Sequence, residues 1–122
     1  MKSRTALTAF AAAAALALPF APMALAADDT QAGSGADAHL AAGKQLFEDW
    51  GCASCHALKD AGASGHIGPA FDANDALTKE FTVGRITNGQ GAMPSFGGLM
   101  TDEEIGTLAD YIVTKKAPKP AS

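Results

Sequence analysis

The clearest repeat of apolar positions lies near the C-terminal end of the chain. Its members recur at intervals of three and four residues, at Ile105, Leu108, Ala109, Ile112 and Val113. This spacing places them on one face of an amphipathic helix. Thr101 and Glu104 stand before them as a capping box, in which each side chain accepts a hydrogen bond from a free backbone N–H. The pattern predicts a helix that starts after Thr101 and packs one face into a core.

Two further helices are predicted upstream. One begins at Asp37, a favourable N-cap, and runs to about Trp50, with one face made by Leu40, Gly43 and Phe47. A shorter one spans about 77–87 and presents Phe81 and Ile86, with Gly89 as its end.

No run of residues predicts a strand, so the expected fold class is all-α over a domain of residues 37–116. The polar, Gly-containing segment 27–36 is expected to be a flexible lead-in. The Pro-broken segment 117–122 is expected to be a flexible tail.

Residues 1–26 have the pattern of a cleaved secretory signal peptide. Lys2 and Arg4 precede an apolar stretch, and the small-x-small sequence over 24–26 is a cleavage site. We therefore expect a soluble, exported mature protein that begins at Ala27 and resides in the periplasm. An uncleaved membrane anchor is the less favoured reading, because the apolar run is short and Pro19 interrupts it.

Composition narrows the possible functions. The 122-residue chain has a net charge of −4, and removing the predicted signal leaves 96 residues with a charge of −6. This balance argues against nucleic-acid or anionic-membrane binding, which needs clustered Lys and Arg. Only 20 large apolar side chains remain after the signal. That is a thin core, which excludes a multidomain enzyme and suggests that a bound group supplies part of the interior.

Both cysteines lie in one motif, Cys52-Ala53-Ser54-Cys55-His56. Two thiols at this spacing can each form a thioether to one vinyl group of a haem, and the adjacent imidazole can bind the iron axially. The motif is therefore a signature of covalent haem attachment. A disulfide, a redox dithiol and a zinc site are the alternatives. The dithiol lacks a preceding strand, and zinc lacks a second pair of ligands.

A haem iron held by one imidazole needs a ligand at its sixth position. His39, His66, Met93 and Met100 are the candidates. Met93 lies in a loop of small residues over 88–96, which can approach a flat group closely. Met93 is the favoured ligand, and His66 is its strongest competitor. His39 is expected to be exposed and Met100 to lie in the core.

The order of these motifs resembles a small class I cytochrome c over residues 40–114. The resemblance implies three to five helices wrapped around one covalent haem c. It also implies thioethers at Cys52 and Cys55, His56 as the proximal iron ligand and Met93 as the distal one. Gly68-Pro69 is similar to the family's Gly-Pro turn, so the carbonyl of Pro69 is expected to accept the N–H of the proximal imidazole.

The resemblance also suggests how the terminal helices pack. Gly43 and Gly106 can permit a close crossing, and the family packs these helices together. We therefore expect Phe47 to contact Leu108 or Tyr111.

The expected function is one-electron transfer, because His/Met ligation leaves the iron no vacant position for substrate. The protein would be no enzyme, but a carrier between an exported dehydrogenase or membrane complex and a terminal acceptor such as an oxidase. Small apolar residues at Ala53, Ala57, Ala92 and Pro94 are consistent with a docking patch at the haem edge, and tight packing on the haem is the equally favoured alternative for them.

Two rival functions remain open. Residues 52–72 resemble haem-proximal segments in cytochrome subunits of periplasmic dehydrogenases, such as sulfite dehydrogenases, so the chain could be a fixed subunit. If Met93 dissociates readily, the haem could instead serve a ligand sensor or a peroxidase.

Overall fold

The computed structural model describes residues 30–120, so the predicted signal peptide lies outside the described residues. Within this range the chain is mainly helical, as predicted. The elements in order are α1 (Thr30–Asp49), the 3-10 turn η1 (Cys52–Ser54), β1 (Ala57–Leu58), the 3-10 turn η2 (Lys59–Ala61), β2 (Ala63–Ser64), α2 (Lys79–Asn88) and α3 (Asp102–Lys115). The small antiparallel hairpin β1–β2, which pairs Ala57 with Ser64, was not predicted.

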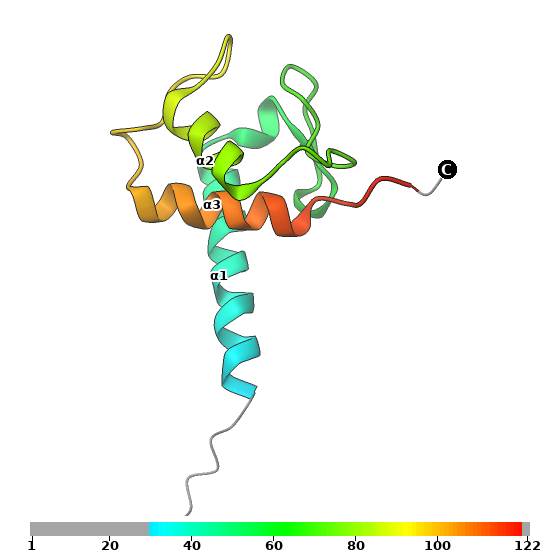
Figure 1. Ribbon diagram of the computed structural model, residues 1–122, viewed down its shortest axis with the longest axis vertical. Helices are drawn as coiled ribbons and strands as arrows, with labels where there is room; N and C mark the ends of the chain where they lie inside the picture. Colours follow the sequence, from blue (N-terminus) through cyan, green and yellow to red (C-terminus); the bar gives the residue numbers. More distant parts are fainter. Residues whose placement is uncertain (1–29, 121–122) are drawn as a thin grey trace, which may run out of the picture.

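Helix α1 begins at Thr30, not at Asp37, so the predicted helix start was wrong. Part of the segment expected to be a lead-in is thus helical. This first half of α1 projects away from the rest of the fold (Figure 1), and residues 33–39 are exposed. Once the packed half of a helix is fixed, each residue added upstream gains a hydrogen bond without a new nucleation cost. The extension therefore needs no tertiary contact, and the sequence pattern gave no signal for it.

The packed half of α1 crosses α3 (Figure 1). Gly43 lies where the two helices meet, because a Cβ built on it would lie 2.7 Å from the carbonyl oxygen of Thr107 and closer still to the Cβ of Tyr111. The rings of Phe47 and Tyr111 meet edge to face with centroids 6.1 Å apart, which confirms the expected contact. Gly106 plays no part in the crossing, because a Cβ there would meet nothing within 4 Å. That part of the prediction was wrong.

The predicted start of α3 and the predicted end of α2 are both confirmed. At the start of α3, Thr101 Oγ1 accepts the N–H of Glu104 at 3.2 Å, and Glu104 Oε2 accepts the N–H of Thr101 at 2.8 Å. The N–H and the hydroxyl of Thr101 both donate to the Glu104 carboxylate and lower its pKa. Helix α2 ends at Asn88, and its C-cap is Gly89, whose positive φ of 67° is readily adopted only by glycine.

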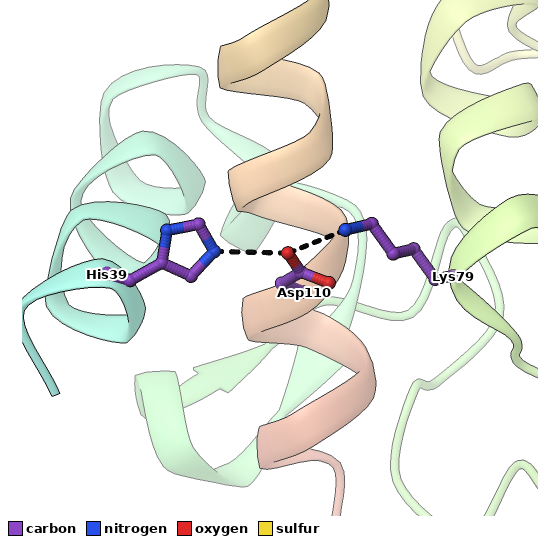
Figure 2. A network of polar contacts seen from close by, with 3 residues as sticks. All are labelled: His39, Lys79 and Asp110. Atoms are coloured by element: carbon purple, nitrogen blue, oxygen red, sulfur yellow. Dashed lines mark hydrogen bonds and ion pairs between the residues drawn. The ribbon is translucent and has the colours of Figure 1, made fainter. Parts of the chain in front are cut away.

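A polar cluster on the surface links all three α-helices. Asp110 of α3 lies between His39 of α1 and Lys79 of α2 (Figure 2), with contacts of 3.1 and 2.8 Å to the two nitrogens. Partial burial of Asp110 opposes ionisation, but the hydrogen bonds from Lys79 and His39 outweigh it and lower the pKa of Asp110. His39 is exposed, as predicted.

The core of the described residues is small. It contains Phe47, Leu58, Phe71, Leu77, Ile86, Met100, Ile105, Leu108, Ala109, Tyr111 and Ile112. None of the helices between residues 30 and 120 has the length and apolar character that a membrane span requires.

The predicted tail boundary also differs from the structure. Ala117 was expected to open a flexible tail, yet its N–H and its carbonyl are both hydrogen-bonded to the segment that follows Phe71. Asp72 and Ala73 are its partners, and neither is near in sequence.

Candidate functional site

A cavity of about 410 Å³ opens between the C-terminal end of α1, helix α2 and the loop that follows α2. Its walls are mostly apolar and aromatic, and they also carry every sulfur and imidazole group that the sequence singled out as a principal ligand. The lining includes Trp50, Cys52, Cys55, His56, Pro69, Phe71, Leu77, Phe81, Ile86, Met93, Phe96, Met100, Leu108 and Ile112. The predicted site residues, far apart in sequence, therefore meet at one cavity.

The two cysteines reach this cavity from a tight turn. Gly51, with a left-handed φ of 68°, leads into the 3-10 turn η1, which begins at Cys52. The carbonyl of Cys52 accepts the N–H of Cys55 at 3.2 Å and that of His56 at 2.9 Å. Both thiols are free and half-buried. The turn therefore presents two thiols to one cavity without joining them.

The environment of Cys52 does not suit a redox dithiol. Burial raises the pKa of the Cys52 thiol to about 11, a backbone hydrogen bond opposes this rise, and the nearby Cys55 adds to it. Reactive dithiols instead have a lowered pKa, because the thiolate is the attacking species. The raised pKa therefore argues against the dithiol alternative.

His56 is buried and held on several sides. Its Nδ1 lies 2.8 Å from the carbonyl oxygen of Pro69. A carbonyl can only accept, so Nδ1 carries a proton, and in the neutral ring Nε2 then keeps a free lone pair. The ring of Phe71 stacks on the imidazole, with centroids 4.5 Å apart and an interplanar angle of 15°. A Cβ on Gly68 would lie 2.8 Å from Nδ1, so only glycine fits there.

Met93 lies on a firmly held loop. Its N–H and carbonyl pair with those of Gln90, both at 3.0 Å. Farther along, the N–H of Phe96 donates to the carbonyl of Ile86 at 3.0 Å. The hydroxyl of Ser95 donates to the backbone carbonyl of Thr87 at 2.5 Å. The loop is thereby fixed along the last turn of α2.

An aromatic contact joins this loop to the segment that carries the cysteines. The rings of Trp50 and Phe96 meet edge to face at 5.8 Å, and both line the cavity. Gly89 allows the close approach of the loop, because a Cβ there would lie 2.7 Å from the carbonyl carbon of Pro94. The backbone of the loop that carries Met93 is therefore held in place.

Of the other candidates for the sixth ligand, the two histidines lie away from the cavity, whereas Met100 forms part of its wall. His66 is exposed and lines a separate open depression of about 630 Å³, beside Lys59 and Asp72. His39 belongs to the surface cluster with Asp110. Met100 is buried in the core, as expected, although it also forms part of the cavity wall.

The expected docking patch is only partly at the cavity. Ala92 and Pro94 are exposed and line its opening, together with Ile67 and Phe81, which are 69% and 47% exposed. Ala53 is half-buried and packs against the core, and Ala57 forms β1. Neither of these two alanines lines the cavity, so that part of the prediction was wrong.

Several residues of the site were missed by the sequence reasoning. Phe71, Trp50 and Phe96 shape the cavity, yet each looked like an ordinary core residue. The one available signal was that Phe71 follows the Gly-Pro turn closely.

The residues present fit a covalently bound haem. The donor set at the cavity is two thiols, one imidazole with a free Nε2 and a thioether, which matches haem attachment and axial ligation. The surrounding walls are apolar and aromatic, as a flat apolar macrocycle requires.

Comparison with known proteins gives a consistent result. Residues 38–112 match the family model described as cytochrome C oxidase, cbb3-type, subunit III. Cytochrome c6 of Leptolyngbya boryana is 40% identical over 81 residues, which cover 64% of this chain and 94% of that protein.

Two solved structures are also similar. The c-type cytochrome SorU from Sinorhizobium meliloti superposes with a TM-score of 0.57 and 38% identity, covering 68% of this chain and 99% of that one. Cytochrome c6 from the diatom Phaeodactylum tricornutum gives a TM-score of 0.50 and 33% identity, with coverages of 62% and 91%.

Proposed function

Because this chain belongs to the class I cytochromes c, electron-transfer proteins that carry one covalent haem, we propose that it works as an exported one-electron carrier. Cys52 and Cys55 hold the haem through thioethers. His56 is the proximal iron ligand and Met93 the distal one. The observation that carries this proposal is the 2.8 Å contact between His56 Nδ1 and the Pro69 carbonyl, at a cavity that both thiols and Met93 line.

Pro69 prepares the imidazole for its role. Its carbonyl accepts a hydrogen bond from the Nδ1–H group, which selects the tautomer with a free Nε2 and increases the basicity of the ring. Gly68 and Phe71 restrict the ring further. These contacts together fix the orientation of the imidazole at the cavity.

Met93 determines the reaction class. When bound, the haem supplies a one-electron Fe(III)/Fe(II) couple. A Met93 thioether bound to the iron would exclude water and small substrates, and backbone hydrogen bonds of Gln90 and Gly97 hold the loop that carries it. The role left to the chain is to bury the ring and to let an electron pass at its edge.

The opening of the cavity suits brief encounters with redox partners. Ile67, Phe81, Ala92 and Pro94 surround it with exposed apolar surface, which needs little desolvation to dock. Small interfaces of this kind are typical of weak electron-transfer complexes. The partners in this proposal are a periplasmic dehydrogenase or membrane complex as donor and an oxidase or similar acceptor.

A pair of methionine variants tests the ligand assignment. Met93→Leu should remove the weak red absorption band that a methionine sulfur gives on ferric haem, because Leu has no donor atom. Met100→Leu is the matched control, since Met100 also lines the cavity but lies in the core. Pyridine haemochrome spectra of both should still report a haem with two thioethers. Loss of the band in Met100→Leu alone would overturn the assignment.

A fixed cytochrome subunit of a larger complex is the second candidate function. It is favoured by the matching family model, whose description names a subunit of an oxidase. Size-exclusion chromatography of a native extract separates the two cases. Elution as a free domain on the order of 10 kDa supports the carrier, whereas co-elution with a larger polypeptide supports the subunit.

A further inference from the structure

The segment that presents Pro69 and Phe71 to His56 contains no long element of its own. Between β2 and α2, residues 65–78 form no helix or strand. Two backbone bonds tie its first part to the cysteine motif: Gly68 N–H to the Cys55 carbonyl at 2.9 Å, and Phe71 N–H to the Ala57 carbonyl at 3.0 Å. The rest of the segment needs another anchor.

Asp72 provides one half of that anchor. Its Oδ2 accepts the N–H of Lys59 at 2.7 Å, and its Oδ1 accepts the N–H of Ala117 at 2.7 Å. Both carboxylate oxygens thus bind backbone amides, one from the start of η2 and one from beyond the end of α3. Hydrogen bonds to an ionised acceptor are stronger than neutral ones.

Lys116 provides the other half. Its ammonium donates to the carbonyls of Asn74 and Leu77, at 2.8 and 2.9 Å. Beside it, the carbonyl of Ala117 accepts the N–H of Ala73 at 2.8 Å. Ala73 has a left-handed φ of 57°, a conformation that costs a non-glycine residue free energy and persists only where the surroundings impose it.

We call these contacts the C-terminal clasp: Asp72, Ala73, Lys116 and Ala117, with the carbonyls of Asn74 and Leu77. The clasp holds the backbone directly after Phe71 and three residues after Pro69. The ring of Phe71 stacks on His56, and the carbonyl of Pro69 accepts a hydrogen bond from Nδ1 of His56. Phe71 is backed in turn by Phe47, with ring centroids 6.2 Å apart. A shift of the clasp would therefore move both groups that orient the imidazole.

We propose that the C-terminal clasp is a positioning device for the proximal ligand: Asp72 and Lys116 act through Pro69 and Phe71 to set the orientation and basicity of the His56 imidazole. The proposal rests on the proposed function, in which His56 binds the iron. It gives the first residues after α3, Lys116 and Ala117, a role in setting the reduction potential.

The test uses the holoprotein and two variants. Asp72→Asn turns an acceptor oxygen into a donor that faces a backbone N–H, and Lys116→Met keeps the stem but removes the ammonium. Asp75→Asn and Lys115→Met are the matched controls, because both residues are exposed and close in sequence. The readouts are the hyperfine-shifted haem methyl resonances of the ferric protein and the reduction potential.

In both clasp variants the chemical shifts of the four haem methyl groups should change relative to one another, because these shifts depend on the orientation of the plane of the axial imidazole. The reduction potential should rise, because a weaker Pro69 contact leaves the ligand less basic and Fe(III) less stabilised. The controls should match the unaltered protein. A lower unfolding temperature with unchanged methyl shifts and potential would overturn the inference, since a purely structural role moves stability alone.

A separate measurement shows whether the proposed function itself fails. If the Nδ1 proton of His56 shows no hyperfine shift in the unaltered protein, His56 is not the ligand and the proposed function fails. If that proton is shifted but the clasp variants match their controls, only the clasp inference fails.

Discussion

At the residue scale, the imidazole of His56 depends on the absence of a side chain at Gly68. A Cβ there would lie 2.8 Å from Nδ1 and 2.9 Å from Nε2, so the ring must move. We expect Gly68→Ala to lower the yield of haem-bound protein and to disturb axial ligation. Gly84→Ala on α2 is the control, because its Cβ would meet nothing within 4 Å. Absorption spectra and haemochrome yield decide, and equal yields for the two variants would contradict the argument.

The candidate ligands could be read from the sequence because their chemistry is local. The spacing of Cys52, Cys55 and His56 alone predicts attachment, and a Met in a Gly- and Pro-containing loop is identifiable as a ligand candidate. The residues that orient them could not be read in this way. Pro69 is 13 positions from His56, and Phe71 is one apolar residue among many. The Pro69 contact was expected only from the family resemblance.

At the element scale, the same distinction separates the helix ends from the connecting segments. The capping box of Thr101 and Glu104 and the stop at Gly89 involve neighbours in sequence, and both were predicted. The segment over 57–77 is shaped by contacts such as that of Asp72 with Ala117, 45 positions apart. No local pattern records such a contact, so the clasp was missed. The hairpin was missed for another reason: its strands, Ala57–Leu58 and Ala63–Ser64, are too short to show an alternating pattern.

The crossing of α1 and α3 makes a prediction about two glycines. Gly43→Ala should destabilise the protein by about 1–3 kcal/mol, the usual cost of overpacking, because its Cβ has no room against Tyr111. Gly106→Ala should instead stabilise α3 by up to about 1 kcal/mol, because it removes a flexible residue from a helix without a clash. Denaturant unfolding of both holoproteins measures the difference. Similar effects for the two substitutions would show that the crossing is not limited by Gly43.

The surface cluster of the three helices makes a prediction about pH. Because the folded state lowers the pKa of Asp110, this carboxylate stabilises the protein above its unfolded pKa of about 3.9, and the gain is lost as the pH falls through the lower folded value. Asp110→Asn should therefore be less stable than the unaltered protein near pH 7, by about 0.2–1 kcal/mol. The gap should close below pH 4. Urea unfolding over pH 3–7 tests this, with Asp75→Asn as the control, and a gap that persists in acid would refute it.

At the scale of the whole molecule, the core is small because many of its apolar side chains surround a cavity and do not pack against one another. Only 20 large apolar side chains follow the predicted signal, and many of the buried ones line a cavity of about 410 Å³. The chain carries a covalent haem, and the cavity with its donor set is the place that fits it. The thin core is therefore completed by the cofactor.

The last prediction follows from that dependence on the cofactor. Without the haem, the apolar walls of the cavity lack the packing contacts that the ring would supply. A small domain has little stability to spare, so the loss of these contacts should prevent fixed packing. A Cys52→Ala, Cys55→Ala double variant produced without haem should keep much of its helical far-UV circular dichroism. It should lose the near-UV signal of packed aromatic rings and melt without a cooperative transition. A sharp thermal transition in this variant, with the near-UV signal intact, would mean that the protein core is complete without its cofactor.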